Sequence, residues 1–170
     1  MPEPVVIATW PFGRVAADAA LPLPAAGWPA LDAVIAGAQS VEDDPDVRSV
    51  GFGSLPDRVG RLTLDAAVMD GTTLRCGAVA GVEHVRHAAA LARRVMEKTP
   101  HVLLVGDGAK WFALQQGFPL EMPYTESAIR EWIAKRTENP SVAPTGPDDI
   151  YLIDESNHDT VTVLGRDSSG

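Results

Sequence analysis

A pair of strand-like runs around Asp70 and Gly71 constrains the fold of this chain more than any other feature. The stretch "LTLDAAVMDGTTLRCGAV", at residues 62–79, places apolar and β-branched residues on both sides of this pair. An Asp-Gly pair favours the tight turn that joins antiparallel strands, because both residues tolerate positive φ angles. The sequence therefore predicts a hairpin and argues against a purely parallel sheet.

Apolar residues at helical spacing predict helices along much of the chain. The first is alanine-rich, follows Arg14 and breaks near Pro22 and Pro24. The second has Pro29 at its first position, and the fourth, "DGAKWFALQQG", is closed by Gly117. The stripes that mark the second, third and fifth helices are Trp28, Leu31, Ile35 and Ala38; Val85, Ala89, Ala92 and Met96; and Ile129, Trp132, Ile133 and Arg136.

Three apolar runs predict further strands. "VVIAT" at residues 5–9 is typical of a buried strand, and "HVLLVG" at 101–106 of a strand buried on both faces. "VTVLG" at 161–165 alternates as a strand does, and the Pro- and Asp-rich segment 139–156 predicts a long exposed loop. Strands that alternate with helices, together with a hairpin, predict layered α/β or α+β packing.

Size and charge limit the class of protein. The chain has 170 residues, enough for one domain with a sizeable core. Its net charge of −9 repels phosphate backbones, so nucleic acid is not an expected partner. The N-terminal stretch has no basic segment followed by a long apolar run, so we expect no signal peptide and no membrane span. The one cysteine, Cys76, cannot form an internal disulfide, which favours a cytoplasmic location. A periplasmic or lysosome-like compartment is the alternative if a leader has been removed.

Two features of the sequence could serve ligand binding. The glycines of "SVGFGS", at residues 49–54, allow close approach of a ligand or another backbone, or else form an ordinary loop. Trp10 stands where a strand ends before Pro11, so it either caps the core or lines the mouth of a pocket. Both alternatives stay open at this point.

The sequence His158-Asp159-Thr160 lies between the long loop and the last predicted strand. Adjacent strand residues point to opposite sides, so His158 and Asp159 do not form a metal site together. A cut between Asp159 and Thr160 would give Thr160 a free α-amine, of pKa about 7.7–8.0, that can act as base for its own hydroxyl. From the residues alone, capping of a turn is the favoured role of Asp159 and Thr160.

Eight stretches, in the same order along the chain, resemble the glycosylasparaginase family of the N-terminal-nucleophile hydrolases. The resemblance covers nearly the whole chain apart from the loop at 139–156. The stretches are "ATWPF", "ALDAVIAG", "SVGFGSLPD", "LDAAVMDGTT", "GAVAGV", "LARRVMEKTPHVLLVGDGA", "FALQQGF" and "NHDTV".

The resemblance implies a fold of four stacked layers, αββα, within one domain portion. Residues 1–159 would correspond to an α subunit, with the exposed loop at 139–156, and residues 160–170 to the start of a β subunit. The expected partners are a small asparagine derivative, the rest of the β subunit and a second αβ unit. The resemblance implies no metal and no cofactor.

The resemblance also implies the chemistry. His158 would constrain a strained turn, Asp159 would assist the hydroxyl of Thr160, and the chain would cut itself between Asp159 and Thr160. Thr160 would then attack the side-chain amide of a glycosylated asparagine and yield aspartate. Trp10, in "TWPF", would lie at the substrate pocket, and Ser49, in "SVGFG", would support the nucleophile.

The chain departs from the family pattern at three places. Ala8 stands where some members have Asn, and Ser54 stands where Gly is frequent. The family's Arg and Asp that hold the α-carboxyl and α-amino groups of the substrate are expected downstream of Gly170. The isolated 170-residue chain is therefore expected to have little or no activity.

Two other functions compete with this interpretation. One is an isoaspartyl peptidase or plain L-asparaginase with the same nucleophile, although "SVGFGSLPD" favours the glycosylasparaginase branch. The other is an inactive truncated remnant that serves only as a structural or binding module.

Overall fold

The computed structural model describes residues 2–138 and 160–169 of the chain. Helices and strands both occur in it, which confirms the expected mixed α+β class. In chain order the elements are β1 (Val5–Ala8), α1 (Gly13–Ala20), α2 (Pro22–Ala25), α3 (Ala30–Glu42), β2 (Leu64–Met69), β3 (Cys76–Val82), α4 (Ala88–Lys98), β4 (Leu103–Val105), α5 (Gly106–Gln115), α6 (Glu126–Glu138) and β5 (Val163–Arg166).

The larger sheet has the strand order β2-β3-β4, with β4 parallel to β3. Strands β2 and β3 pair in antiparallel fashion with Met69 opposite Cys76, which confirms the hairpin. The connection takes residues 70–75 rather than a two-residue turn. Asp70 stabilises it by accepting hydrogen bonds from the backbone N–H of Thr72 at 3.1 Å and the hydroxyl of Thr73 at 2.6 Å.

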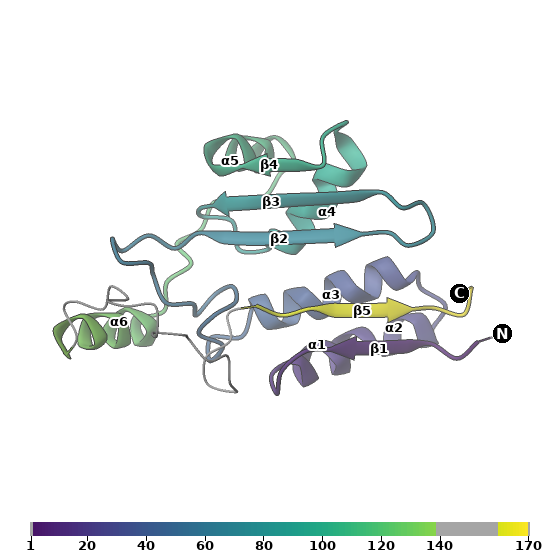
Figure 1. The fold of residues 1–170 in the computed structure, drawn as a ribbon, viewed down its shortest axis with the longest axis horizontal. Coiled ribbons are helices and arrows are strands. Elements are labelled where there is room, and N and C mark those ends of the chain that lie inside the picture. The colour runs from purple at the N-terminus through teal and green to yellow at the C-terminus, as the bar shows by residue number, and fades with distance from the viewer. Residues whose placement is uncertain (1, 139–159, 170) are drawn as a thin grey trace, which may run out of the picture.

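The smaller sheet joins the beginning of the described chain to its end. Strands β1 and β5 are antiparallel, with Ala8 opposite Val163, and lie side by side in Figure 1. Beyond this pair, the N–H of Thr9 donates to the carbonyl of Thr162 at 3.1 Å, and the N–H of Thr162 donates to Oγ1 of Thr9 at 2.9 Å. These bonds fix the position of the chain just after Thr160.

Each sheet is covered by its own helices. Helices α4 and α5 pack on the larger sheet, and α1 and α3 pack on the smaller one (Figure 1). Helix α3 also contacts α4, so it links the smaller sheet and its helices to the larger sheet and its helices. Leu91 on α4 and Val79 on β3 are fully buried at the centre of the larger core, where Gly77 lets the helix approach the strand closely.

Two strands that the sequence predicts as buried are largely exposed. In β4, Leu103 is 49% and Val105 58% exposed, and in β1, Ile7 is 60% exposed. An apolar run is buried on both faces only where helices cover both faces of the sheet, and β4 is also an edge strand. The prediction of burial is therefore wrong for both strands.

The ends of the helices agree with the sequence in part. Gly117 follows α5 with φ 83°, and the N–H of Phe118 donates to the carbonyl of Ala113, as a helix-closing glycine requires. Trp28, by contrast, lies outside α3 and is exposed, and Pro29 occupies the position before the first helical residue. Within the described residues, none of the helices combines the length and apolarity that a membrane span needs.

Candidate functional site

A cavity of about 670 Å³ lies between β2 and β5 and contains two of the predicted site residues. Thr160 and the residues that follow it form one wall, and the loop that carries Ser49 contributes to another. These two residues are far apart in the sequence, and the fold brings both to one cavity. Helix α3 and the first residues of α4 line the same space.

Thr160 is exposed and lies just before β5, so the end of the strand holds it at the mouth of the cavity. His158 and Asp159 fall outside the described residues, as does the predicted loop at 139–156. The strand pairing therefore fixes the residues after the predicted cleavage point, through the two bonds between Thr9 and Thr162.

Trp10 directly follows Thr9, whose backbone N–H donates to the carbonyl of Thr162 at 3.1 Å. The backbone of Trp10 has φ 68°, a left-handed conformation that is uncommon for a large aromatic residue and is often held at functional sites. Trp10 is half-buried and is not among the residues that line the cavity.

The loop that carries Ser49 is packed against the end of α3. The N–H of Phe52 donates to the carbonyl oxygen of Glu42 at 2.6 Å. Gly51 has φ 68°, and a Cβ there would lie 2.3 Å from the Cα of Glu42. Of the two interpretations of "SVGFGS", close approach of another backbone is therefore the one that the fold contains at Gly51.

Glu42 places a buried carboxyl at this cavity. Its side chain is part of the last turn of α3 and only 5% of the residue is exposed. Oε1 accepts a hydrogen bond from the N–H of Ala89 at 2.8 Å, at the start of α4. Oε2 is buried and has no hydrogen-bond partner among the described residues.

Burial raises the pKa of Glu42 from 4.5 to about 7. The hydrogen bond from Ala89 and the charge of His87 oppose this rise, whereas the neighbouring carboxylate of Asp43 adds to it. Glu42 therefore changes its protonation state near neutral pH, whereas an exposed glutamate is fully ionised there.

Asp43, next to Glu42, binds the side chains of Arg86 and His87. Its Oδ1 lies 2.5 Å from Nε of Arg86 and 3.1 Å from Nε2 of His87. Burial raises the pKa of Asp43, but the hydrogen bonds from Arg86 and His87 outweigh that effect and lower the pKa overall. The guanidinium of Arg86 also stacks on the ring of Phe52, 4.2 Å from its centroid.

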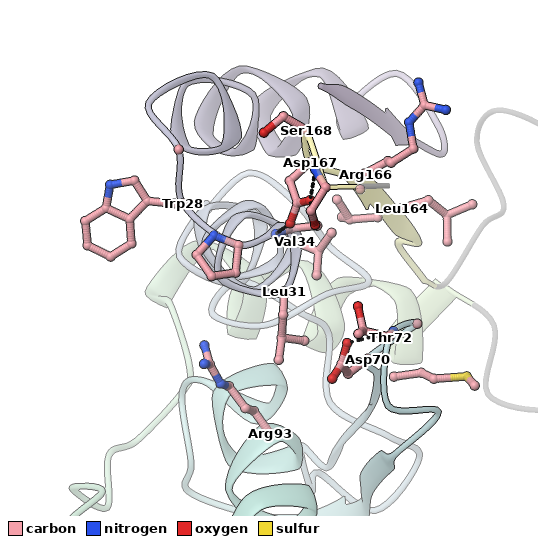
Figure 2. A pocket seen from close by; sticks show the side chains of 18 residues that line it. Trp28, Leu31, Val34, Asp70, Thr72, Arg93, Leu164, Arg166, Asp167 and Ser168 are labelled. Atoms are coloured by element: carbon pink, nitrogen blue, oxygen red, sulfur yellow. Dashed lines mark hydrogen bonds between the residues drawn. The ribbon is translucent and has the colours of Figure 1, made fainter. Parts of the chain in front are cut away.

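A second cavity, of about 820 Å³, lies beside the opposite end of β5 and contains none of the predicted site residues (Figure 2). Two of the charged side chains that line it, Arg93 and Asp167, bind to other groups of the protein. Arg93 pairs with Asp32 and Glu97, and Asp167 accepts a hydrogen bond from the N–H of Ala30 at 2.8 Å, at the start of α3. The residues that line both cavities are Val34, Met69, Val163 and Leu164.

No group of three or more His, Cys, Asp or Glu side chains within residues 2–138 and 160–169 is arranged to hold a metal ion. The first cavity offers hydroxyl and carboxyl groups, which come from Ser49, Thr63, Thr160 and Thr162 and from Glu42 and Asp65. A hydroxyl beside a cavity is a potential nucleophile once a base activates it.

A sequence model of the asparaginase family matches residues 6–170. The chain belongs to the asparaginase family. It is 44% identical to the N(4)-(beta-N-acetylglucosaminyl)-L-asparaginase of Elizabethkingia miricola, over 99% of this chain and 47% of that protein. It is 37% identical to the protein of the same name from Rattus norvegicus, over 99% of this chain and 53% of the relative.

The chain is also similar to a second kind of relative. The chain is 48% identical to a plant-type L-asparaginase of Pyrococcus horikoshii, over 61% of this chain and 33% of that protein. The chain thus spans about half the length of the N(4)-(beta-N-acetylglucosaminyl)-L-asparaginases it matches. The similarity to these relatives extends over nearly all of the chain, whereas the similarity to the plant-type enzyme covers a smaller part.

Proposed function

We propose that this chain is part of an N-terminal threonine amidohydrolase that cleaves itself between Asp159 and Thr160 and then hydrolyses the side-chain amide of glycosylated asparagine. The observation that supports this most directly is the common cavity of Thr160 and Ser49. The names of the relatives that match nearly the whole chain support the substrate class.

In the proposed self-cleavage, Oγ1 of Thr160 attacks the carbonyl carbon of Asp159. The C–N bond between the two residues breaks as an ester forms, and water then hydrolyses the ester to a carboxylate on Asp159 and a free amine on Thr160. His158 constrains the turn and Asp159 assists removal of the proton from the hydroxyl. The hydrogen bonds between Thr9 and Thr162 hold one side of the bond that breaks.

In the proposed hydrolysis, the free α-amine of Thr160 takes the proton of its own hydroxyl, because its pKa of about 7.7–8.0 suits a base near neutral pH. Oγ1 attacks the side-chain amide carbon of the substrate, and the aminosugar leaves with a proton. Water then releases aspartate from the acyl-enzyme. Ser49, which lines the same cavity, supports the nucleophile, and Trp10 contacts the substrate.

The proposal includes a partner segment that completes the sheets. Residues 1–159 form the α-subunit part, residues 160–170 begin the β subunit, and two such αβ units associate. Strands β2 and β5 each pair on one side only within the described residues, and both line the cavity. The uncovered faces of β1 and β5 expose Ile7 and Leu164, which a second sheet of a four-layer αββα fold would cover.

The test is to express the full reading frame and to measure the intact mass and the new N-terminal sequence. We expect a fragment that begins at Thr160. The variant Thr160→Ala should give one uncut chain, whereas Thr162→Ala should be cut like the wild type, because Thr162 contributes backbone bonds to Thr9. A wild-type chain that stays uncut for days would refute the proposal and favour the inactive structural module.

Plain L-asparaginase activity is the second candidate, supported by the similarity to the plant-type relative. A panel of aspartyl-glucosamine, L-asparagine and an isoaspartyl dipeptide separates the two. Preference for aspartyl-glucosamine supports the proposed function, and preference for either of the others supports the second candidate. A cytoplasmic location stays a prediction that cell fractionation can test.

A further inference from the structure

Glu42 connects three walls of the cavity that contains Thr160. Its backbone carbonyl accepts a hydrogen bond from the N–H of Phe52, and its side chain accepts one from the N–H of Ala89. Gly51 packs directly on its Cα. Glu42, the residues 49–51 and the start of α4 all line the cavity, so this single residue joins α3, the Ser49 loop and α4 where they meet the site.

The charged groups around Glu42 do not bind its free oxygen. Asp43, which directly follows α3, binds both Arg86 and His87 from the segment before α4. Residues 49–51 and 160–162, which line the same cavity, contain no charged side chain, and Asp65, which also lines it, accepts a hydrogen bond from the N–H of Gly81 at 2.6 Å. Oε2 of Glu42 is therefore buried without a partner within the described residues, a costly arrangement that stability alone does not explain.

We propose that Glu42 is a positioning residue of the active site, whose side chain holds the start of α4 against the end of α3 in the geometry that Thr160 requires. The inference rests on the proposed function. The carboxyl acts through the bond from Ala89, whereas the Ser49 loop contacts backbone atoms of Glu42, and the residue takes no part in bond making itself. As a carboxylate it is a stronger acceptor for the N–H of Ala89 than as a neutral acid.

The first test compares wild type with Glu42→Gln in the full-length protein, by measuring kcat/KM for aspartyl-glucosamine from pH 5.5 to 8.5. A neutral glutamic acid and a glutamine are similar in size and polarity, and burial raises the pKa of Glu42 to about 7. We expect nearly equal activity at pH 5.5 and about a fivefold lower value for Glu42→Gln at pH 8.5, because only the wild type gains the charged acceptor. A ratio that is constant over this range would overturn the proposal.

Glu97→Gln is the matched control. Glu97 is a half-buried acid on α4 that pairs with Arg93 and Arg94 and does not line the cavity of Thr160. Its substitution removes the same charge by the same chemical change, so its activity ratio to the wild type should not vary with pH. A pH-dependent ratio in Glu97→Gln of the same size would assign the effect to overall charge and overturn the proposal.

The second test does not depend on turnover. Amide hydrogen exchange at Ala89 should be at least about tenfold faster in Glu42→Ala than in wild type, with no change there in Glu97→Ala. Unchanged exchange at Ala89 would overturn the proposal. If wild type neither cuts itself nor hydrolyses the substrate, the proposed function fails, and the exchange measurement still decides whether Glu42 holds the start of α4.

Discussion

Replacing Gly77 with Ala tests how closely α4 packs on the larger sheet. Gly77 is buried on β3, and a Cβ at this position would lie 2.3 Å from the carbonyl oxygen of Ala92 and 2.5 Å from the backbone N of Met96. Both atoms belong to the backbone of α4, so no side-chain rotation can relieve the contact. The helix must move away from the strand, and the packing around Leu91 must loosen with it.

The size of the effect follows from that geometry. Extra atoms in a packed core cost about 1–3 kcal/mol, and a contact with fixed backbone lies at the upper end, so we expect about 3 kcal/mol for Gly77→Ala. For a protein of this size each kcal/mol lowers Tm by about 2–4 °C, which predicts a fall of about 6–12 °C. Thermal unfolding followed by far-ultraviolet circular dichroism, at one scan rate and one protein concentration, measures it.

Gly108→Ala is the control for this substitution. Gly108 lies in α5, and a Cβ there would meet no atom within 4 Å. Alanine is the better helix former, so Tm should stay the same or rise slightly, by the equivalent of about 0.5–1 kcal/mol. If Gly77→Ala had the same Tm as the wild type, α4 could not pack on β3 as closely as described. That result would refute the reasoning.

Three further substitutions test the core and the site. Leu91→Ala, at a fully buried position, should lower the free energy of unfolding by about 3 kcal/mol, as measured by urea titration; a loss below about 1 kcal/mol would contradict its central place in the core. Gly51→Ala should cost about 2 kcal/mol or more in the same titration, because φ is 68° and the new Cβ would meet the backbone of Glu42; a neutral result would mean that the loop lies further from α3. Because the pKa of Glu42 is raised by folding, its contribution to stability is complete below pH 4.5 and is lost as pH rises through about 7, which at 1.36 kcal/mol per pH unit amounts to about 3 kcal/mol. Stability of the wild type should fall relative to Glu42→Gln across that range, and parallel curves would contradict the raised pKa.

The sequence predicted the hairpin because its information is local. The strand pattern and the turn residues around Asp70 are close together in the chain, and they are enough to specify an antiparallel pair. The exposure of β4 was not predictable in the same way. Leu103 and Val105 have the composition of a buried strand, but they point to a face of the sheet that none of the described helices covers, whereas Leu104 between them packs against the core.

That Ser49 and Thr160 line one cavity could be expected only through the resemblance to a known family. No periodicity or spacing rule connects two segments that are so distant along the chain. In the structure their common cavity depends on β1 pairing with β5, which sets the residues after Thr160, and on the Ser49 loop folding back on α3. Such long-range pairings are properties of the whole fold rather than of a motif.

Glu42 is a different case, since its burial could have been predicted from the sequence. Leu31, Ile35 and Ala38 form an apolar stripe with helical spacing, and the next step of four residues leads to Glu42 rather than to an apolar residue. The acidic run that follows favours a solvated loop, and that local composition hides the position. A carboxyl that continues the buried stripe of a helix must either be paired or be costly. Here one oxygen binds Ala89 and the other has no partner among the described residues, in the same cavity as Thr160. An ionisable residue on an apolar stripe is therefore the sequence signal to examine for a functional role.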